Sequence, residues 1–168
     1  MLVFDATPLI YLAKVEKLHL LRDIGKKRVI PRAVFEEVVV KGKEAGKVDA
    51  LIVERLIERG VFQVVEVEET DIYKKLKENR NLSKADVEVL ALAKIKDGIA
   101  VVDEDYARGV ADVEDIKCGG TVYLILSLLR EDVITKMEAR KIIDDTIEKG
   151  WFCSTDLYAK ILRKLEEV

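Results

Sequence analysis

Short apolar runs alternate along the chain with longer segments of helical periodicity. Apolar runs of about four residues bounded by turn residues predict buried strands. The expected strands cover residues 2–4, 28–30, 62–65, 99–102 and, more weakly, 115–118. Helices are expected at about 7–23 with a break, 32–41, 45–59, 70–79, 83–96, 104–112, 121–130, 135–148 and 154–166. Strands separated by helices pair in parallel through right-handed crossovers, so the pattern predicts an α/β fold.

Length and composition fit one globular domain over residues 1–168, with a core at about 1–130 and C-terminal helices at 131–168. Hydrophobic residues make up 49 % and charged residues 36 %, which argues against disorder. No glycine- or serine-rich linker, repeat or low-complexity tract divides the chain. We expect the C-terminal helices to pack on one edge of the fold or to support an oligomer.

Charge and cysteine content limit the partners and the cellular location that we expect. The net charge of −3 offers no global attraction for nucleic acid, so such a partner needs a local basic patch. Cys118 and Cys153 match no metal-ligand or disulfide pattern, and we expect a reducing, cytoplasmic location. The sequence shows neither a signal peptide nor an apolar stretch long enough to span a bilayer, so no membrane partner is expected.

The absence of several residue types leaves carboxylates as the candidate chemistry. His19 is the only histidine, which leaves one candidate base for a hydrolase triad, and we expect a structural or surface role for it. No phosphate-binding glycine motif follows the first strand. Acidic residues do follow predicted strands, and the ends of parallel strands are where α/β proteins bind ligands. Carboxylates gathered there indicate a hard divalent cation.

Each acidic cluster also has an ordinary structural explanation. Asp5 could cap the helix that begins near Pro8. Glu36 and Glu37 flank the apolar face of their helix about equally, so periodicity does not choose between them.

Two further acidic clusters could likewise have either a structural or a metal-binding role. Asp86 forms a capping box with Ser83, yet its helix is apolar on nearly every side, where a carboxylate is costly without a partner. Glu88 on the same helix is a reserve ligand. Residues 103–105, all acidic, could cap the next helix or bind a cation.

Four motifs in order resemble the PIN-domain nucleases. They are Asp5-x-Thr7; Ile30-Pro31-x-x-Val34-x-x-Glu37-Val38; Leu82-Ser83-x-Ala85-Asp86-x-Glu88-x-x-Ala91-Leu92-Ala93; and Val101-Val102-Asp103-Glu104-Asp105. The segments Asp5 to Lys14, Asp103 to Ala111 and Gly120-Thr121 are similar to the branch close to VapC-type toxins. The resemblance implies a three-layer α/β/α sandwich around a parallel sheet of about five strands, with C-terminal helices.

The same resemblance implies an activity and a site. It implies an endoribonuclease that uses Mg²⁺ or Mn²⁺ and acts as the toxin of a toxin–antitoxin pair, with a stand-alone role in RNA processing equally open. Asp5, Glu37, Asp86 and Asp103 correspond to the catalytic acids, with Asp105 also a metal ligand. One alignment of the last motif pairs Asp103 with Glu104, and another makes Asp105 the ligand. The proposed partners are an RNA substrate, a small antitoxin protein and a second copy of the chain.

Substrate contacts and rival functions complete the prediction. Thr7 would orient water or a phosphate oxygen, and Arg32, Arg80, Lys84 and Arg108 lie beside the acidic motifs, where they could hold RNA. One alternative is a catalytically silent PIN-like module that binds RNA or protein. The other is a Mg²⁺-dependent phosphoryl-transfer domain of the receiver or phosphatase kind.

Overall fold

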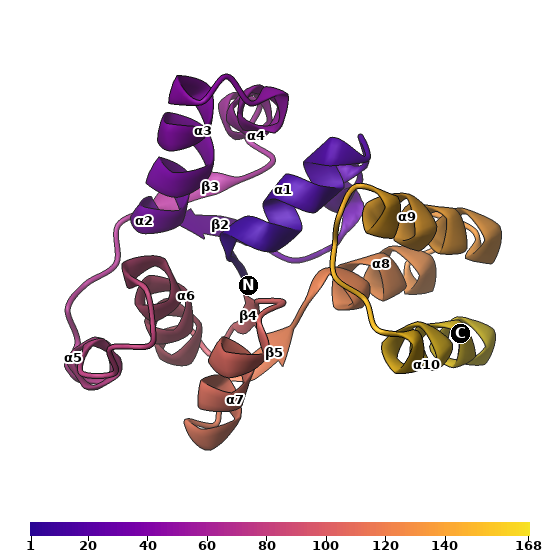
Figure 1. Cartoon of the computed structure of the whole chain (residues 1–168). Coiled ribbons are helices and arrows are strands. Elements are labelled where there is room, and N and C mark those ends of the chain that lie inside the picture. The colour runs from indigo at the N-terminus through magenta and orange to yellow at the C-terminus, as the bar shows by residue number, and fades with distance from the viewer.

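The computed structural model describes residues 1–168 and places a parallel sheet of five short strands at the centre (Figure 1). The strand order is β3-β2-β1-β4-β5, and every neighbouring pair is parallel. The strands are β1 (Leu2–Phe4), β2 (Arg28–Pro31), β3 (Gln63–Val65), β4 (Ile99–Val101) and β5 (Lys117–Gly119). The predicted α/β sandwich is confirmed.

Ten α-helices, one 3₁₀-helix (η1) and one π-helical turn (η2) surround the sheet. They are α1 (Ala6–Lys14), η1 (Leu18–Asp23), α2 (Arg32–Phe35), η2 (Glu36–Val40), α3 (Lys41–Glu44), α4 (Val48–Glu58), α5 (Asp71–Lys77), α6 (Lys84–Ile95), α7 (Asp105–Val113), α8 (Thr121–Arg130), α9 (Lys136–Glu148) and α10 (Thr155–Glu167). None of them is both long and apolar enough to cross a bilayer.

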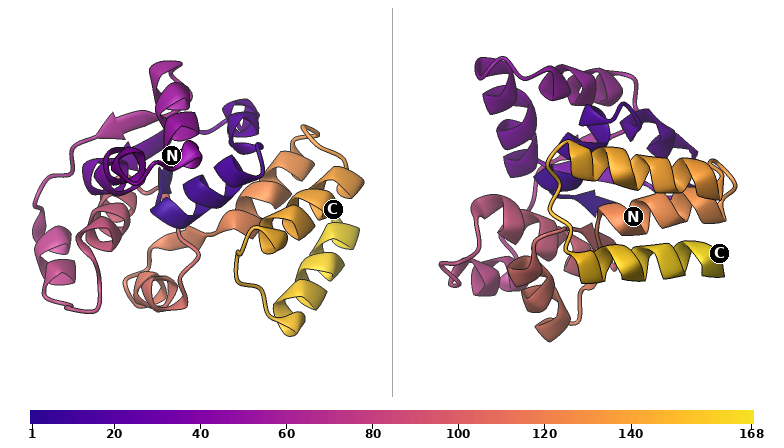
Figure 2. Two further views of the ribbon diagram at one scale, coloured as in Figure 1. Left: turned by 45° about the horizontal axis from the view of Figure 1, so that its top comes forward. Right: turned by 45° about the vertical axis from the view of Figure 1, so that its right-hand side comes forward.

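The helices form a layer on each side of the sheet (Figure 2). α1 packs against α4 on one side, while α6 packs on β1, β2 and β4 on the other. Because both faces of the sheet are covered, β1 is a fully buried apolar run, as is typical of central parallel strands. The core is one cluster of 46 buried residues that extends from Leu2 to Leu165.

The second predicted helix differs from the structure at its centre. A regular helix was expected over 32–41, whereas the structure continues to Glu44 and contains a π-helical turn at Glu36–Val40. A π-turn holds one more residue than an α-helical turn and is frequent at functional sites. It therefore changes the direction of the side chains on either side of it.

The helix expected over 7–23 is broken, as the sequence indicated. α1 ends at Lys14, and Glu16 adopts a left-handed φ of 59° before the 3₁₀ segment η1 begins at Leu18. His19 lies on η1 and is exposed.

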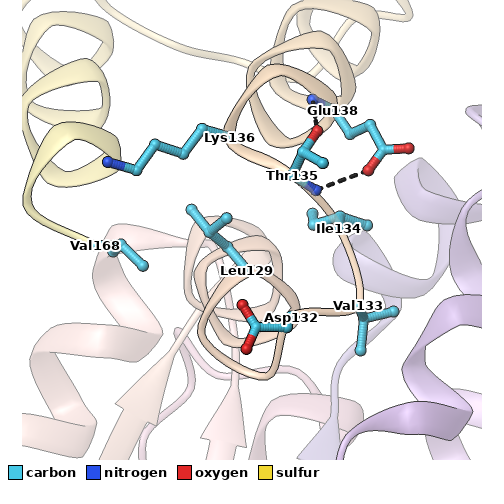
Figure 3. A pocket seen from close by; sticks show the side chains of 8 residues that line it. All are labelled: Leu129, Asp132, Val133, Ile134, Thr135, Lys136, Glu138 and Val168. Carbon is cyan, nitrogen blue, oxygen red and sulfur yellow. Dashed lines mark hydrogen bonds between the residues drawn. The ribbon is translucent and has the colours of Figure 1, made fainter.

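The C-terminal helices pack on the β5 edge of the sheet. α8 contacts η1 and α9, and α10 contacts α9. α9 begins with a capping box, in which Thr135 accepts a hydrogen bond from the backbone N–H of Glu138 and its own N–H donates to the Glu138 carboxylate (Figure 3). α8 also contacts β5, so these helices extend from that edge of the sheet, while a role in an oligomer stays a prediction.

Candidate functional site

The site lies where β1 and β4 end side by side. The chain leaves β1 into α1 on one face of the sheet and leaves β4 into α7 on the other, and in open α/β sheets the ligand crevice lies at such a switch point. The backbone N–H of Asp5 donates to the carbonyl of Val101 at 3.0 Å, which fixes Asp5 beside the end of β4. The first predicted acid is thus held at the switch point of the sheet.

Asp5 is buried in this crevice without a compensating cation. Its side chain makes no capping hydrogen bond to α1, and only 8 % of the residue is exposed. The pKa of Asp5 is raised from 3.8 to about 7, mainly because the carboxyl is buried. A hydrogen bond from the Ala6 N–H acts in the opposite direction, and the negative charges of Asp86, Glu37 and Glu104 contribute to the increase. Asp5 therefore lies in the electrostatic field of three other acids, and we call these four residues the acidic crevice.

Two of these acids come from helices that pack together. Glu37 is exposed on the π-turn η2, and its charge, rather than that of Glu36, acts on Asp5. Asp86 is buried at the start of α6, where its carboxylate accepts a 2.8 Å hydrogen bond from the N–H of Ser83. Asp86 therefore does cap α6, and its negative charge also acts on Asp5.

Asp103 points its carboxylate toward the C-terminal helices. It accepts hydrogen bonds from the backbone N–H and the hydroxyl of Thr121, both at 2.7 Å, and from the indole N–H of Trp151 at 3.1 Å. A carboxylate has about four lone-pair positions, and three are used here. Asp103 thus links β4, α8 and the α9–α10 connection.

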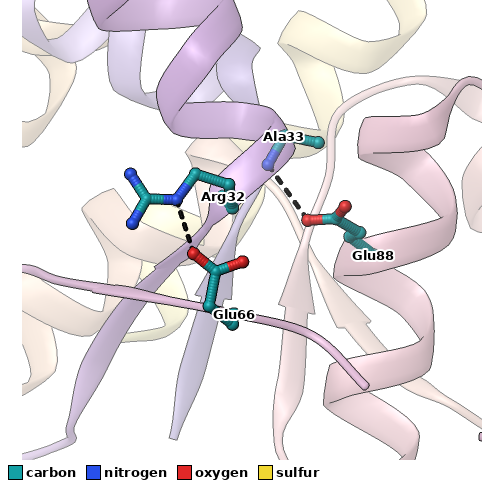
Figure 4. A network of polar contacts seen from close by, with 4 residues as sticks. All are labelled: Arg32, Ala33, Glu66 and Glu88. Atoms are coloured by element: carbon teal, nitrogen blue, oxygen red, sulfur yellow. Dashed lines mark hydrogen bonds and ion pairs between the residues drawn. The ribbon is translucent and has the colours of Figure 1, made fainter. Parts of the chain in front are cut away.

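The other acids of the sequence prediction lie at the margins of the crevice. Asp105 is exposed in the first turn of α7, where its negative charge interacts favourably with the positive end of the helix dipole. Glu88 is buried and accepts a 3.0 Å hydrogen bond from the N–H of Ala33, an otherwise unpaired donor at the start of α2 (Figure 4). Glu88 therefore holds α2 against α6 and is occupied in that role.

The basic residues expected to hold substrate have different surroundings. Arg32 forms a 2.8 Å ion pair with Glu66 (Figure 4), whereas Lys84 and Arg80 are exposed. Arg108 donates from Nη1 to the carbonyl of Val102 at 3.1 Å, which fixes its guanidinium at the end of β4.

The acidic crevice suits a hard divalent cation by its chemistry. It offers only oxygen ligands, and none of its four carboxylates forms an ion pair. No group of three or more His, Cys, Asp or Glu side chains is close enough together to hold a metal ion. Binding of Mg²⁺ or Mn²⁺ would require these carboxylates to converge.

Sequence reasoning did not find the hydrogen bonds of Asp103. Trp151 is 48 residues away along the chain, and no local pattern joins the two. It also did not single out Lys160 and Lys164 of α10, although their i, i+4 spacing beside Leu157 and Ile161 places all four on one side of a helix.

Residues 1–167 match a protein family described as a PIN domain. No curated protein matches the chain.

Proposed function

The chain therefore belongs to the PIN-domain family, and from this membership and the acidic crevice we propose that it is a metal-dependent endoribonuclease. PIN domains are nucleases in general, which supports a hydrolase. The observation that supports the metal-dependent reaction is the field of Asp86, Glu37 and Glu104 at the buried Asp5. Such a concentration of uncompensated carboxylates is costly unless a cation offsets it.

In this proposal the four acids of the crevice hold the cation. Asp5 and Asp86 are buried and fixed by the backbone, whereas Glu37 and Glu104 are exposed and able to move toward a ligand. Glu104 takes the place that the family resemblance gives first to Asp103, because Asp103 already accepts three hydrogen bonds.

The protein's own groups then orient the substrate. A bound Mg²⁺ or Mn²⁺ would lower the pKa of water and neutralise charge on the scissile phosphate. Thr7, half-buried in the first turn of α1, presents a hydroxyl that can orient water or a phosphate oxygen. The Arg108 guanidinium, fixed on Val102, places positive charge beside the crevice. His19 is exposed and has no part in this arrangement.

An RNA cleavage assay tests the proposal. We expect hydrolysis of single-stranded RNA with Mg²⁺ or Mn²⁺, none with EDTA, and a loss of at least about 100-fold in Asp5→Asn, since general base and metal-ligand roles contribute on that order. Asp112→Asn is the matched control, because Asp112 is exposed on α7 and outside the crevice. Cleavage by Asp5→Asn at the rate of the unmodified protein would contradict the proposal.

A catalytically silent module is the alternative function, and metal binding separates the two. Calorimetry with Mn²⁺ should show binding below millimolar concentrations that Asp5→Asn abolishes. Absence of binding in that range would favour the silent module.

The toxin role, the antitoxin and the homodimer follow from the resemblance alone and stay predictions. The reading frame beside the gene tests the first two, and size-exclusion chromatography tests the third.

A further inference from the structure

A second pocket borders the acidic crevice on the side of the C-terminal helices. It lies against β5, α7, α8 and α10 and has a volume of about 440 Å³. Pockets of about 300–1,000 Å³ are of the size that holds small organic ligands. Asp103 and Asp105 line this pocket, while Glu104 between them belongs to the crevice. The pocket and the crevice therefore share one turn of the chain.

The lining of this pocket is basic although the protein is acidic. Its cations are Arg108, Arg130, Lys160 and Lys164, against the carboxylates Asp103 and Asp105. Asp103 is further offset by the three hydrogen bonds it accepts. None of the four cations forms an ion pair. Positive charge left unpaired in a concave site favours an anionic ligand.

Three other pockets lack this excess of positive charge. The pocket beside α2 and α6 has three cations, of which Arg32 is paired, and three glutamates. The pocket at the end of α8, drawn in Figure 3, has Lys136 against Asp132 and Glu138. The pocket beside Tyr158 has only Asp144 as a charged residue. The basic pocket is thus a local exception on a chain of net charge −3.

An apolar wall accompanies the cations. Val122, Tyr123, Leu157 and Ile161 also line the pocket. Tyr123 lies directly against Gly119, where a Cβ atom would come within 2.6 Å of its ring, so the absence of a side chain at Gly119 lets the ring lie close on β5. Cations combined with an aromatic and aliphatic wall are typical of sites for single-stranded nucleic acid, where phosphates meet the charges and bases meet the apolar groups.

We propose that this pocket binds one nucleotide of the single-stranded RNA next to the bond that is cleaved in the acidic crevice, an inference that rests on the proposed function. Lys160, Lys164 and Arg130 would contact the phosphate, and the wall containing Tyr123 would contact the base. Arg108, fixed at the end of β4, stands at the turn that the pocket and the crevice share. The C-terminal helix α10 thereby contributes to RNA binding.

The experiment measures RNA binding without cleavage. A fluorescein-labelled single-stranded RNA of ten nucleotides is titrated in EDTA at several salt concentrations and followed by anisotropy. We expect the Lys160→Ala/Lys164→Ala protein to bind roughly tenfold more weakly, as for lost charged hydrogen bonds. We also expect the salt dependence of binding to decrease by about 0.7 in slope, since one phosphate contact to a single strand contributes about that much.

The matched control is Lys149→Ala/Arg163→Ala. It removes the same charge from α10 and the end of α9, at exposed positions that do not line the pocket. Equal losses in the two double variants would overturn the proposal. Displacement of the RNA by micromolar uridine monophosphate would assign the pocket to a free nucleotide and would also overturn it. RNA binding that depends on Lys160 and Lys164 in a protein that cleaves no RNA would support the pocket and contradict the nuclease activity.

Discussion

At the scale of single residues, Asp103 and Glu104 are neighbours in sequence with opposite surroundings. Asp103 is surrounded by donors from Thr121 and Trp151, which stabilise its charge. Glu104 has no such donors, is exposed, and adds negative charge to the crevice around Asp5. The first residue is thus suited to hold the fold together and the second to bind a cation.

Substitution at each of the two positions separates these roles. Glu104→Gln should weaken Mn²⁺ binding by at least about tenfold, because a metal ligand is lost. Asp103→Asn should keep Mn²⁺ binding and lower the free energy of unfolding by about 1–3 kcal/mol, since it leaves buried donors poorly paired. Calorimetry and urea unfolding measure the two quantities. If Asp103→Asn abolishes Mn²⁺ binding and Glu104→Gln has little effect on it, Asp103 and not Glu104 is the metal ligand.

Asp5 makes the stability of the metal-free protein depend on pH. Its pKa is about 7 in the folded state, above its ordinary value of 3.8. Between these values the folded protein keeps a proton that the unfolded chain has released, so stability falls as pH rises from about 4 to about 7. Since one unit of pKa difference corresponds to about 1.4 kcal/mol, the effect is measurable.

Removal of the ionisable group at position 5 should therefore stabilise the protein at high pH. In EDTA we expect Asp5→Asn to be more stable than the unmodified chain at pH 8, and this difference to shrink at pH 4.5. Urea unfolding at both pH values measures it, with Asp112→Asn as the control. An Asp5→Asn effect of equal size at both pH values would show that the charge of Asp5 is not its source.

At the scale of elements, the start of α8 is packed tightly against the end of β4. Gly120 is the N-cap of α8, and a Cβ atom there would lie 2.4 Å from Oδ1 of Asp103. Only glycine lets the N–H of Thr121 approach the Asp103 carboxylate at 2.7 Å. The close approach of these two elements thus depends on one missing side chain.

Gly120→Ala should destabilise the protein by about 1–3 kcal/mol, the usual cost of overpacking. The matched control is Gly109→Ala in α7, where a Cβ atom meets nothing within 4 Å. That substitution should stabilise the protein by about 0.5–1 kcal/mol, because glycine is unfavourable inside a helix. Urea unfolding of both variants measures the contrast. A neutral effect of Gly120→Ala would mean that α8 can shift away from Asp103 at no cost.

The sequence predicted elements better than it predicted the contacts between them. All five strands were found to within two residues at each end, because four of them are short apolar runs between turn residues. The weakest signal, before β5, gave the largest error, two residues at its start. The capping box of Ser83 and Asp86 was also found, since its signal is local. The π-turn at Glu36–Val40 and the Asp103–Trp151 hydrogen bond were not, because both depend on how distant elements pack.

At the scale of the whole molecule, metal binding and folding should be coupled. The sheet brings together Asp5, Glu37, Asp86 and Glu104 from four separate segments, so the unfolded chain has no comparable site. A ligand that binds only the folded state stabilises it by mass action. The metal-free crevice opposes folding by repulsion, and a cation would remove that repulsion.

Thermal unfolding tests this coupling. At Mn²⁺ concentrations 100 times the Kd, the gain is about 2.7 kcal/mol, which raises the Tm of a chain of this size by roughly 5–11 °C. Trp151 is the only tryptophan and is buried, so its fluorescence reports the unfolding. Asp5→Asn should show no such shift. A full shift in that variant would place the metal elsewhere.

The π-turn has a consequence for how this protein tolerates changes in length. Because each helical residue turns the chain by about 100°, deletion of one residue within Glu36–Val40 would convert the segment to ordinary α-helix. The part of the helix after the deletion, including α3, would then rotate by about 100° relative to the part before it, including α2. Either Glu37 would leave the crevice or α3 would leave its contact with α4, in which Gly42 fits tightly against Ala50. A one-residue insertion or deletion, which a surface loop would absorb, would here act as a rotation of one part of the molecule against another.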